Sequence, residues 1–418
     1  MKILALARKN LGRHRGRTIL SLIAVALGVA IIIFTKGYTE GMINDLLNNH
    51  IRLMAGHVRI IHPEYQKKER LLSLTLPVEG YTDGGLDEML AQLEEMPETR
   101  VVAPRIKFGA LVPKDEKTEG VLGVAVRPQA EEELARISQY VGEGRWLQKG
   151  REVVVGSKFL QEMGLEVGDE ITVVANSAYG SLRARSYRVV GAFASGLKYL
   201  DENTIYMTLP EGQDLLEMPG QATEILLGLK DGDAGPIVFA EKYSRWQKEK
   251  YGQEVYTAVP WQKSSPLIET ALIEKAVYHE IYLLIAVLSA FVVFNTMMMI
   301  VNERRREIGM LKALGMTRRQ IIGLFLGEGL YISVIGGLMG VAIGGAATWY
   351  LSQNPLDFSA IMKTLDKNLL FYPKIYFSSN VADLFYAFFV GVVVTLIASF
   401  LPARRGSKLP PSEALRSL

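Results

Sequence analysis

The chain has 418 residues, of which 49% are hydrophobic and only 22% are charged, and its mean hydropathy of +0.15 is high for a water-soluble protein. The formal net charge of +3 is unremarkable. The absence of cysteine excludes disulfide frameworks, cysteine-based zinc sites, iron–sulfur clusters and thiol catalysis. The composition therefore predicts membrane-embedded segments and excludes a wholly soluble enzyme.

Four uncharged apolar runs are each long enough to cross a hydrocarbon core of about 30 Å at about 1.5 Å per helical residue. They cover residues 18–35, 281–301, 329–351 and 384–401. The first run lacks a convincing small-residue cleavage site, which favours a retained helix over a cleaved signal peptide. We therefore predict transmembrane helices at 18–40, at 276–302 with an adjoining stalk, at 321–352 and at 383–401.

Basic residues beside these runs predict the orientation of the chain. Residues 1–17 carry six Lys or Arg and no acid, 302–320 carry six against two acids, and the tail 402–418 carries four against one. By the positive-inside rule these segments, and so both termini, face the cytoplasm of a cell (inner) membrane protein. Apolar residues at helical spacing in the first segment favour an interfacial amphipathic helix on membrane lipid over a nucleic-acid-binding arm.

The loop between the first and second helices, 41–275, is large enough to form an independent extracytoplasmic domain. Helix-like stretches occur near 87–93 and 240–250. Strand-like runs occur at 57–61, 101–102, 121–126, 152–155, 170–174, 187–190, 205–207 and 224–229. The predicted fold class is a membrane protein with four transmembrane α-helices and a large α+β extracytoplasmic domain between the first and second. A further outside segment, 353–382, is predicted as a short lid or spacer.

The second membrane helix is predicted to begin outside the membrane. Ser265 and Pro266 suit the N-cap and first position of a helix, and no Gly or Pro follows until after Arg306. Such an uninterrupted helix would connect the outside domain to the cytoplasmic face.

Several small and polar residues inside the predicted spans could serve either helix packing or transport. Gly336, Gly340 and Gly344 recur every four residues, which favours close helix packing over a substrate-lining role. Asn295 is expected to hydrogen-bond between helices rather than to contact cargo. Glu328 lies near the cytoplasmic start of the third span, where pairing with basic groups or a direct coupling role is open. Lys36 is expected to extend to the outer membrane surface.

No catalytic or metal-binding pattern emerges from the sequence. The chain contains no Gly-Lys dipeptide, so it has no phosphate-binding GxxxxGK[ST] loop. His279-Glu280 begins like a zinc-protease motif, but Leu283 stands where the second histidine is required. We therefore predict no enzyme activity, no metal site and no cofactor in this chain.

The loop after the second span, 303–320, is the most informative stretch. Ile308, Leu311 and Leu314 recur at helical spacing, Gly315 can end that helix, and Thr317 can cap the next. The short amphipathic helix could lie on lipid, or its apolar ridge could bind a groove on a cytoplasmic partner.

Two long segments resemble the FtsX/MacB-type (type VII) ABC transporter permeases. Residues 294–321 read FNTMMMIVNERRREIGMLKALGMTRRQI and resemble the permease signature, and residues 401–416 read LPARRGSKLPPSEALR and resemble the family's ending. Residues 144–173 and 187–196 are similar to the family's extracytoplasmic core. ALARKNLGRHRGRTILSLIAVALGV near the start, with GHVRIIHPEY at 56–65, is most similar to the lipoprotein-releasing (LolC/LolE-like) branch.

The resemblance implies a permease subunit that works as a dimer with a second copy or a paralogue. ATP and Mg²⁺ would bind on separate cytoplasmic ABC ATPase subunits. Residues 303–315 would form the coupling helix. The residues implied in this coupling are Glu303, Arg304, Arg305, Glu307, Ile308, Leu311, Leu314 and Gly315. Of these, the three apolar side chains would enter the ATPase groove, and Arg304, Arg305 and Glu307 would pair with charges at its rim.

Three functions remain open within this resemblance. The first is extraction or export of a lipoprotein or another lipid-like amphiphile. The second is mechanotransmission without transport, in which ATP cycles move the outside domain to activate a partner such as a cell-wall hydrolase. The third is a macrolide- or peptide-type amphiphile exporter.

Overall fold

The computed structural model describes residues 15–81, 84–114, 117–230, 235–357 and 374–408, together with Ala7 and Pro410. These residues divide into two compact units. The first, which we call the helix bundle, takes the described residues up to Asp45, those from Ala271 to Asp357, and those from Lys374 onward. The second, the core domain, takes the described residues from Leu46 to Thr270.

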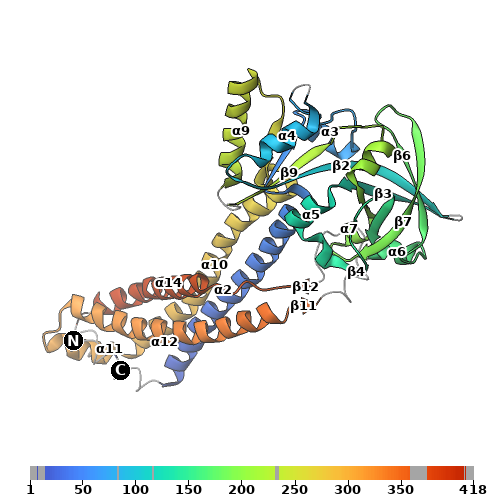
Figure 1. Cartoon of the computed structure of the whole chain (residues 1–418). Coiled ribbons are helices and arrows are strands. Elements are labelled where there is room, and N and C mark those ends of the chain that lie inside the picture. The colour runs from blue at the N-terminus through green and yellow to red at the C-terminus, as the bar shows by residue number, and fades with distance from the viewer. Residues whose placement is uncertain are drawn as a thin grey trace. The chain divides into compact units, whose positions relative to one another are not determined.

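Within the described residues, four helices are long and apolar enough to cross a membrane (Figure 1). They are α2 (Arg15–Asn49), α10 (Pro266–Glu303), α12 (Arg318–Gln353) and α14 (Val381–Lys408). A short helix, α11 (Arg305–Ala313), joins α10 to α12. The predicted set of four transmembrane helices with a large mixed domain between the first and second is therefore confirmed.

Helix ends differ from the predicted boundaries at several points. Helix α10 begins at Pro266, but it ends at Glu303 rather than Arg306 because the Arg304 backbone leaves the helical range at ψ +15°. Helix α2 runs past residue 40 and continues as a π-helical turn, η1 (His50–Ala55). Helix α14 passes through Pro402 to Lys408. At about 1.5 Å per residue, the 40-residue helix Gly16–Ala55 is about twice as long as a hydrocarbon core is thick.

Ten strands in the described part of the core domain form one sheet. Nine of them follow the order β10-β1-β9-β2-β3-β8-β5-β7-β4, and the tenth, β6, pairs with both β2 and β7. Their bounds are β1 Val58–Ile61, β2 Thr99–Lys114, β3 Lys117–Val126, β4 Val141–Gly144, β5 Glu152–Gly156, β6 Glu170–Asn176, β7 Leu182–Phe193, β8 Thr204–Thr208, β9 Glu224–Leu229 and β10 Thr257–Pro260. All eight predicted strand runs lie in or overlap these strands.

The long strand β2 belongs to two parts of the sheet. Its first half pairs with β9, where Val102 lies opposite Leu227, and its second half pairs with β3 and β6, where Ala110 lies opposite Ala175. Because β6 also pairs with β7, the strands β2, β3, β8, β5, β7 and β6 close into a ring. Alternating burial along β6 and buried runs along β3 and β5 place apolar side chains inside this ring.

Short helices cover the sheet. They are α3 (Tyr65–Lys68), α4 (Gly85–Glu94), α5 (Pro128–Ala135), α6 (Ser157–Glu162), α7 (Lys198–Asn203), α8 (Leu209–Leu215) and α9 (Gly235–Tyr251), with 3₁₀ turns at Glu69–Leu71, Ile137–Tyr140 and Trp261–Lys263. Helices α4 and α9 contain the two predicted helical stretches. A two-stranded ladder, β11 (Leu356–Asp357) with β12 (Lys374–Ile375), lies in the predicted segment 353–382. Residues 358–373 of that segment, nearly all of 1–14, and most of the tail after 408 lie outside the described residues.

Charged residues of three neighbouring strands, β9, β1 and β2, form a buried network in the core domain. Glu224 is fully buried and pairs with Lys107 at 2.8 Å and with Arg59 at 3.3 Å, and Arg59 also pairs with Glu69. Burial alone would raise the pKa of Glu224, but the charges of Lys107 and Arg59 outweigh burial and lower that pKa below its ordinary value. A second pair, Arg105 with Glu131, is also almost fully buried.

Glu224→Gln is expected to reduce the free energy of unfolding of the core domain by about 3 kcal/mol at pH 7, because breaking a buried pair leaves a cation uncompensated. Since the folded pKa of Glu224 is lowered, its contribution is complete above the ordinary pKa of 4.5 and is lost as pH falls through the folded pKa. Denaturant titrations of the full chain in detergent, followed by tryptophan fluorescence, measure this. The exposed control Glu249→Gln should change nothing; equal stability of Glu224→Gln and the parent chain at pH 7 would contradict the assignment.

Candidate functional site: the coupling loop and the helix bundle

The loop between α10 and α12 is folded back on the helix bundle by defined turns. Gly315 follows α11 with φ +93°, a left-handed conformation that favours glycine, and the Met316 amide donates to the Leu311 carbonyl at 3.0 Å. Thr317 then caps α12 through a reciprocal capping box with Gln320. The loop is therefore a rigid helix–turn–helix, with α11 held between two membrane helices.

Arg304 is the centre of an ion-pair group at this loop. Its side chain is buried, its Nη1 donates to Glu328 at 2.9 Å, and its Nε donates to Glu307 at 2.8 Å. The guanidinium also lies 5.9 Å from the centre of the Phe325 ring. Burial would lower the pKa of Arg304, but the two carboxylates outweigh burial and raise it, so the group stays charged. The group ties the end of α10 to both α11 and α12.

Further contacts attach the loop to the other two helices. Arg17 of α2 pairs with Glu303, and Lys312 of α11 donates to the Ser407 carbonyl of α14 at 3.1 Å. Arg305 donates to Asn302 at 3.1 Å and is otherwise exposed. Side-chain contacts therefore connect the segment 303–312 to α2 and α14 as well as to α10 and α12.

The apolar ridge of α11 does not all face outward. Leu314 is 84% exposed and Met310 is 46% exposed one turn earlier, while Leu311 is half-buried. Ile308, which was expected to enter a partner groove, is only 2% exposed and packs with Val301, Phe325 and Ala403. Ile308 therefore anchors α11 to its own bundle, and the outward apolar surface is formed by Met310 and Leu314.

The glycine stripe of α12 lies against α2. A Cβ on Gly336 would lie 2.9 Å from the Cβ of Val25, and one on Gly344 would lie 3.0 Å from the Ala30 Cα. At Gly340 it would lie 2.6 Å from the Ala26 carbonyl oxygen. A Cβ would therefore clash at Gly336 and Gly340 and would be tight at Gly344, so the two helices approach as closely as small residues allow in lipid.

Gly340→Val is expected to lower the thermal unfolding midpoint of the bundle, because overpacking a tight contact costs about 1–3 kcal/mol. Gly323→Ala is the matched control on the same helix: a Cβ there meets nothing within 4 Å, and Ala favours helix over Gly by up to about 1 kcal/mol. Thermal unfolding of both variants in detergent measures the difference. A midpoint for Gly340→Val at or above that of Gly323→Ala would contradict the packing assignment.

Two intramembrane polar residues lie elsewhere than the sequence suggested. Asn295 is exposed on α10, and among the described residues its side chain has no hydrogen-bond partner. Lys36, which was expected to extend away from the bundle, is 7% exposed and pairs with Glu40 at 2.8 Å and with Asp383 at 3.1 Å. The ion pair with Asp383 connects α2 to α14. A buried cation is stable only when anionic groups lie beside it, as Glu40 and Asp383 do here.

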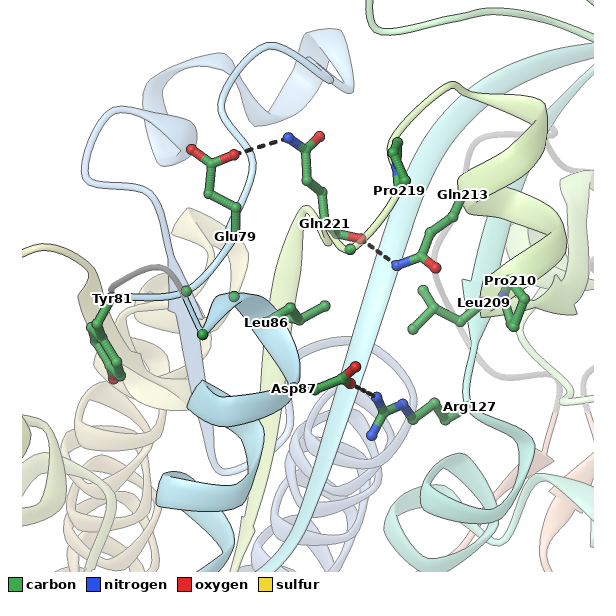
Figure 2. A pocket seen from close by; sticks show the side chains of 14 residues that line it. Glu79, Tyr81, Leu86, Asp87, Arg127, Leu209, Pro210, Gln213, Pro219 and Gln221 are labelled. Carbon is green, nitrogen blue, oxygen red and sulfur yellow. Dashed lines mark hydrogen bonds and ion pairs between the residues drawn. The ribbon is translucent and has the colours of Figure 1, made fainter.

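The core domain carries an open polar cavity of about 830 Å³ between α4 and α8 (Figure 2). Its polar groups are paired with one another: Arg127 with Asp87 at 2.5 Å, and Gln221 with Glu79 at 2.9 Å. Since the charges lining it already have partners, we assign it no ligand. Among the described residues, no group of three His, Asp or Glu side chains could hold a metal ion.

Four helices long and apolar enough to cross a membrane, with a large sheet domain between the first and the second, define a multi-pass membrane protein of the permease kind. Residues 18–240 match the MacB-like periplasmic core domain, and residues 281–411 match the FtsX-like permease C-terminal region. The chain belongs to the family of ABC transporter permeases that combine these two regions.

Relatives match over nearly the full chain at low identity. The lipoprotein-releasing system transmembrane protein LolC of Xylella fastidiosa is 23% identical over 95% of this chain and 92% of its own length. LolE of Haemophilus influenzae is 24% identical over 95% and 93%. The macrolide export ATP-binding/permease protein MacB of Psychrobacter arcticus is 23% identical over 96% of this chain but only 57% of its own length.

Contacts of three residues were missed by sequence reasoning: Lys312 with Ser407, Lys36 with Asp383, and Arg17 with Glu303. Each pair is far apart in the chain, so no local spacing indicates it. The Arg304–Glu328 pair agrees with one of the two predicted roles of Glu328, pairing with a basic group, because a run of three arginines follows the preceding membrane helix.

Proposed function

We propose that this chain is the permease subunit of an ABC transporter that extracts or exports a lipoprotein or another lipid-like amphiphile. A separate cytoplasmic ABC ATPase, which would bind ATP and Mg²⁺, moves the loop 303–315, and the helix bundle passes that movement to the core domain. A second permease subunit, either another copy or a paralogue, completes the complex. Both termini and the loop would face the cytoplasm.

The single observation that carries this proposal is the continuity of two helices. The boundaries between the two compact units fall inside the helical segment Gly16–Ala55 and inside α10, after Asp45 and after Thr270. A continuous helix resists bending far better than a loop, so movement of α10 at its cytoplasmic end is delivered to its other end. The Arg304 group fixes that cytoplasmic end to α11.

An amphiphile is the cargo class best supported by the chemistry of the bundle. Inside the bundle Lys36 is paired with Glu40 and Asp383, and Glu328 is paired with Arg304. Many large apolar side chains of α10 are exposed. A water-filled path for a polar solute would need polar lining. Relatives named for lipoprotein release match 95% of the chain, which supports the lipid-anchored version of such cargo.

Reconstitution tests this proposal. The chain, its second permease subunit and the ATPase are placed in proteoliposomes with a fluorescent triacylated lipoprotein, and release is followed after ATP addition. We expect ATP-dependent release that vanishes when the ATPase carries a catalytic-glutamate substitution. Absence of release with active ATP hydrolysis, together with stimulation of a cell-wall hydrolase, would replace transport by pure mechanotransmission; release of a macrolide or peptide but not the lipoprotein would change the cargo.

A further inference from the structure

The strand that follows the first long helical segment pairs with the strand that precedes α10. After η1 the chain continues directly into β1, and before α10 it comes from β10 through the turn at Trp261–Lys263. These strands are antiparallel neighbours, with Val58 opposite Pro260. The Trp261 amide donates to the His57 carbonyl at 3.1 Å, which extends the pairing up to the helix ends.

A side-chain hydrogen bond joins the two helix ends directly. His50 Nε2 lies 2.7 Å from Ser264 Oγ, although 214 positions separate the two residues. The Ser264 hydroxyl donates its proton to the Trp261 carbonyl at 2.7 Å. Its remaining role toward His50 is that of acceptor, so His50 donates from Nε2. Ser264 is 7% exposed and His50 is half-buried, so water has limited access to the bond.

Two cations from β2 hold the last turn of the first helix. Arg105 Nη1 donates to the Leu53 carbonyl at 2.9 Å, and Lys107 Nζ donates to the Met54 carbonyl at 3.4 Å. These carbonyls belong to η1, where the helix end leaves acceptors unpaired and carries partial negative charge. Cations at this position therefore stabilise the helix end while fixing it to the central strand.

The cations are themselves held in place by buried carboxylates. Glu131 accepts from Arg105 Nε at 2.9 Å and from Nη2 at 2.5 Å, and both side chains are 1% exposed. Glu224 pairs with Lys107 at 2.8 Å. A bidentate Arg–carboxylate pair fixes the direction of the guanidinium. With the guanidinium held in this way, Nη1 is directed at the Leu53 carbonyl.

We propose that His50, Ser264, Arg105 and Lys107 form a clasp that stays closed throughout the ATP cycle. The clasp holds the ends of the two membrane helices together, so that both helices move the sheet as one rigid element. These four residues are therefore positioning residues for the coupling of ATP hydrolysis to movement of the core domain. This inference rests on the proposed function, which supplies both the ATP cycle and the cargo readout. Sheet pairing, the interhelical hydrogen bond and the capped carbonyls all converge on the same joint, whereas domain stability alone would not require a bond between the two helix ends.

The first experiment asks whether the clasp stays closed. The chain contains no cysteine, so His50→Cys with Ser264→Cys introduces the only thiols. In the full complex we expect cross-linking by oxidant or by dibromobimane to equal extents with and without vanadate-trapped nucleotide. The disulfide replaces the lost His50–Ser264 hydrogen bond, so the cross-linked complex should hydrolyse ATP within about twofold of the parent rate and release at least as much cargo per ATP as the reduced double variant. Cross-linking confined to one state, none in either state, or release that returns only after disulfide reduction would overturn the proposal.

The second experiment asks whether the clasp matters for coupling. Ser264→Ala removes the acceptor for His50, and we expect lipoprotein released per ATP hydrolysed to fall about tenfold while the ATPase rate stays within about twofold. Ser264→Thr retains the hydroxyl and should restore release. The control Lys242→Ala breaks an exposed pair with Glu98 in the same domain and should change neither value.

If folded Ser264→Ala has the parental unfolding midpoint and releases as much lipoprotein per ATP as the parent chain, the clasp is only a structural contact and the proposal is overturned. Arg105→Lys provides a second variant that keeps the charge but loses the fork to Glu131, with the same expected loss. If the parent complex releases no lipoprotein at all, the proposed cargo fails, and the cross-linking experiment still decides whether the clasp is closed.

Discussion

Replacing Leu314 with aspartate is expected to abolish co-purification of the cytoplasmic ATPase while the chain still folds and inserts. Leu314 is 84% exposed at the end of α11, next to the exposed Met310, so it contributes little to the fold of its own chain. An apolar anchor at the centre of an interface contributes about 2 kcal/mol or more to binding, and a carboxylate placed there would also be desolvated. Affinity capture through a tag on the ATPase, in mild detergent, measures the loss.

Two variants make the docking result specific. Leu314→Met keeps an apolar side chain of similar volume and should retain the ATPase. Leu311→Asp, at the half-buried neighbour, should weaken binding in the same direction. Full recovery of the ATPase with Leu314→Asp, in a chain that migrates as a folded monodisperse complex, would show that α11 lies on lipid and is not the docking element.

Glu328→Gln is expected to uncouple ATP hydrolysis from cargo release. The substitution leaves buried Arg304 with Glu307 as its remaining carboxylate partner, and breaking a buried ion pair costs about 3–5 kcal/mol. Arg304 joins the ends of α10 and α12 to α11. When its ion pair with Glu328 is weakened, α11 can move without moving α10 and α12. We expect the ATPase to stay bound, with hydrolysis retained, a lower unfolding midpoint, and release per ATP reduced by about tenfold.

Two further variants distinguish loss of the buried ion pair from a general effect of changed charge. Arg304→Glu combined with Glu328→Arg restores an opposite-charge pair and should recover part of the release. Glu303→Gln breaks the pair with Arg17, whose side chains are about one-third exposed, and should cost under about 1 kcal/mol. Parental release and a parental midpoint in Glu328→Gln would contradict the role of the Arg304 group.

Much of the fold was predictable because its signals are local. Proline at the first position of α10, the cap at Thr317 and the glycine turn at Gly315 each act within a few residues. Apolar runs of membrane length and alternating strand patterns are likewise local, and the four helices and the α+β domain follow from them. Strands β4 and β10 were not predicted: β4 has half-buried and exposed residues only, and both are short, so neither carries a strong pattern.

The rest depends on contacts between distant residues. Closure of the sheet through β6 and β2 is a pairing of strands some 60 positions apart, and nothing within either strand specifies it. The burial of Ile308 depends on Phe325 and Ala403, which an isolated amphipathic helix does not reveal. Likewise, η1 and its capped carbonyls become visible only when Arg105 of β2 is placed beside them.

Transmission of movement from the ATPase through the membrane helices to the core domain is tested by distance measurements between spin labels. In the cysteine-free chain, Tyr179→Cys on the core domain is 80% exposed and is labelled, with a second label at the corresponding position of the other permease subunit. Double electron–electron resonance is recorded without nucleotide and after vanadate trapping. We expect the distance distribution to shift on trapping in the parent complex and to remain unshifted in Glu328→Gln. An unchanged distance in a parent complex that hydrolyses ATP would contradict transmission through the helices.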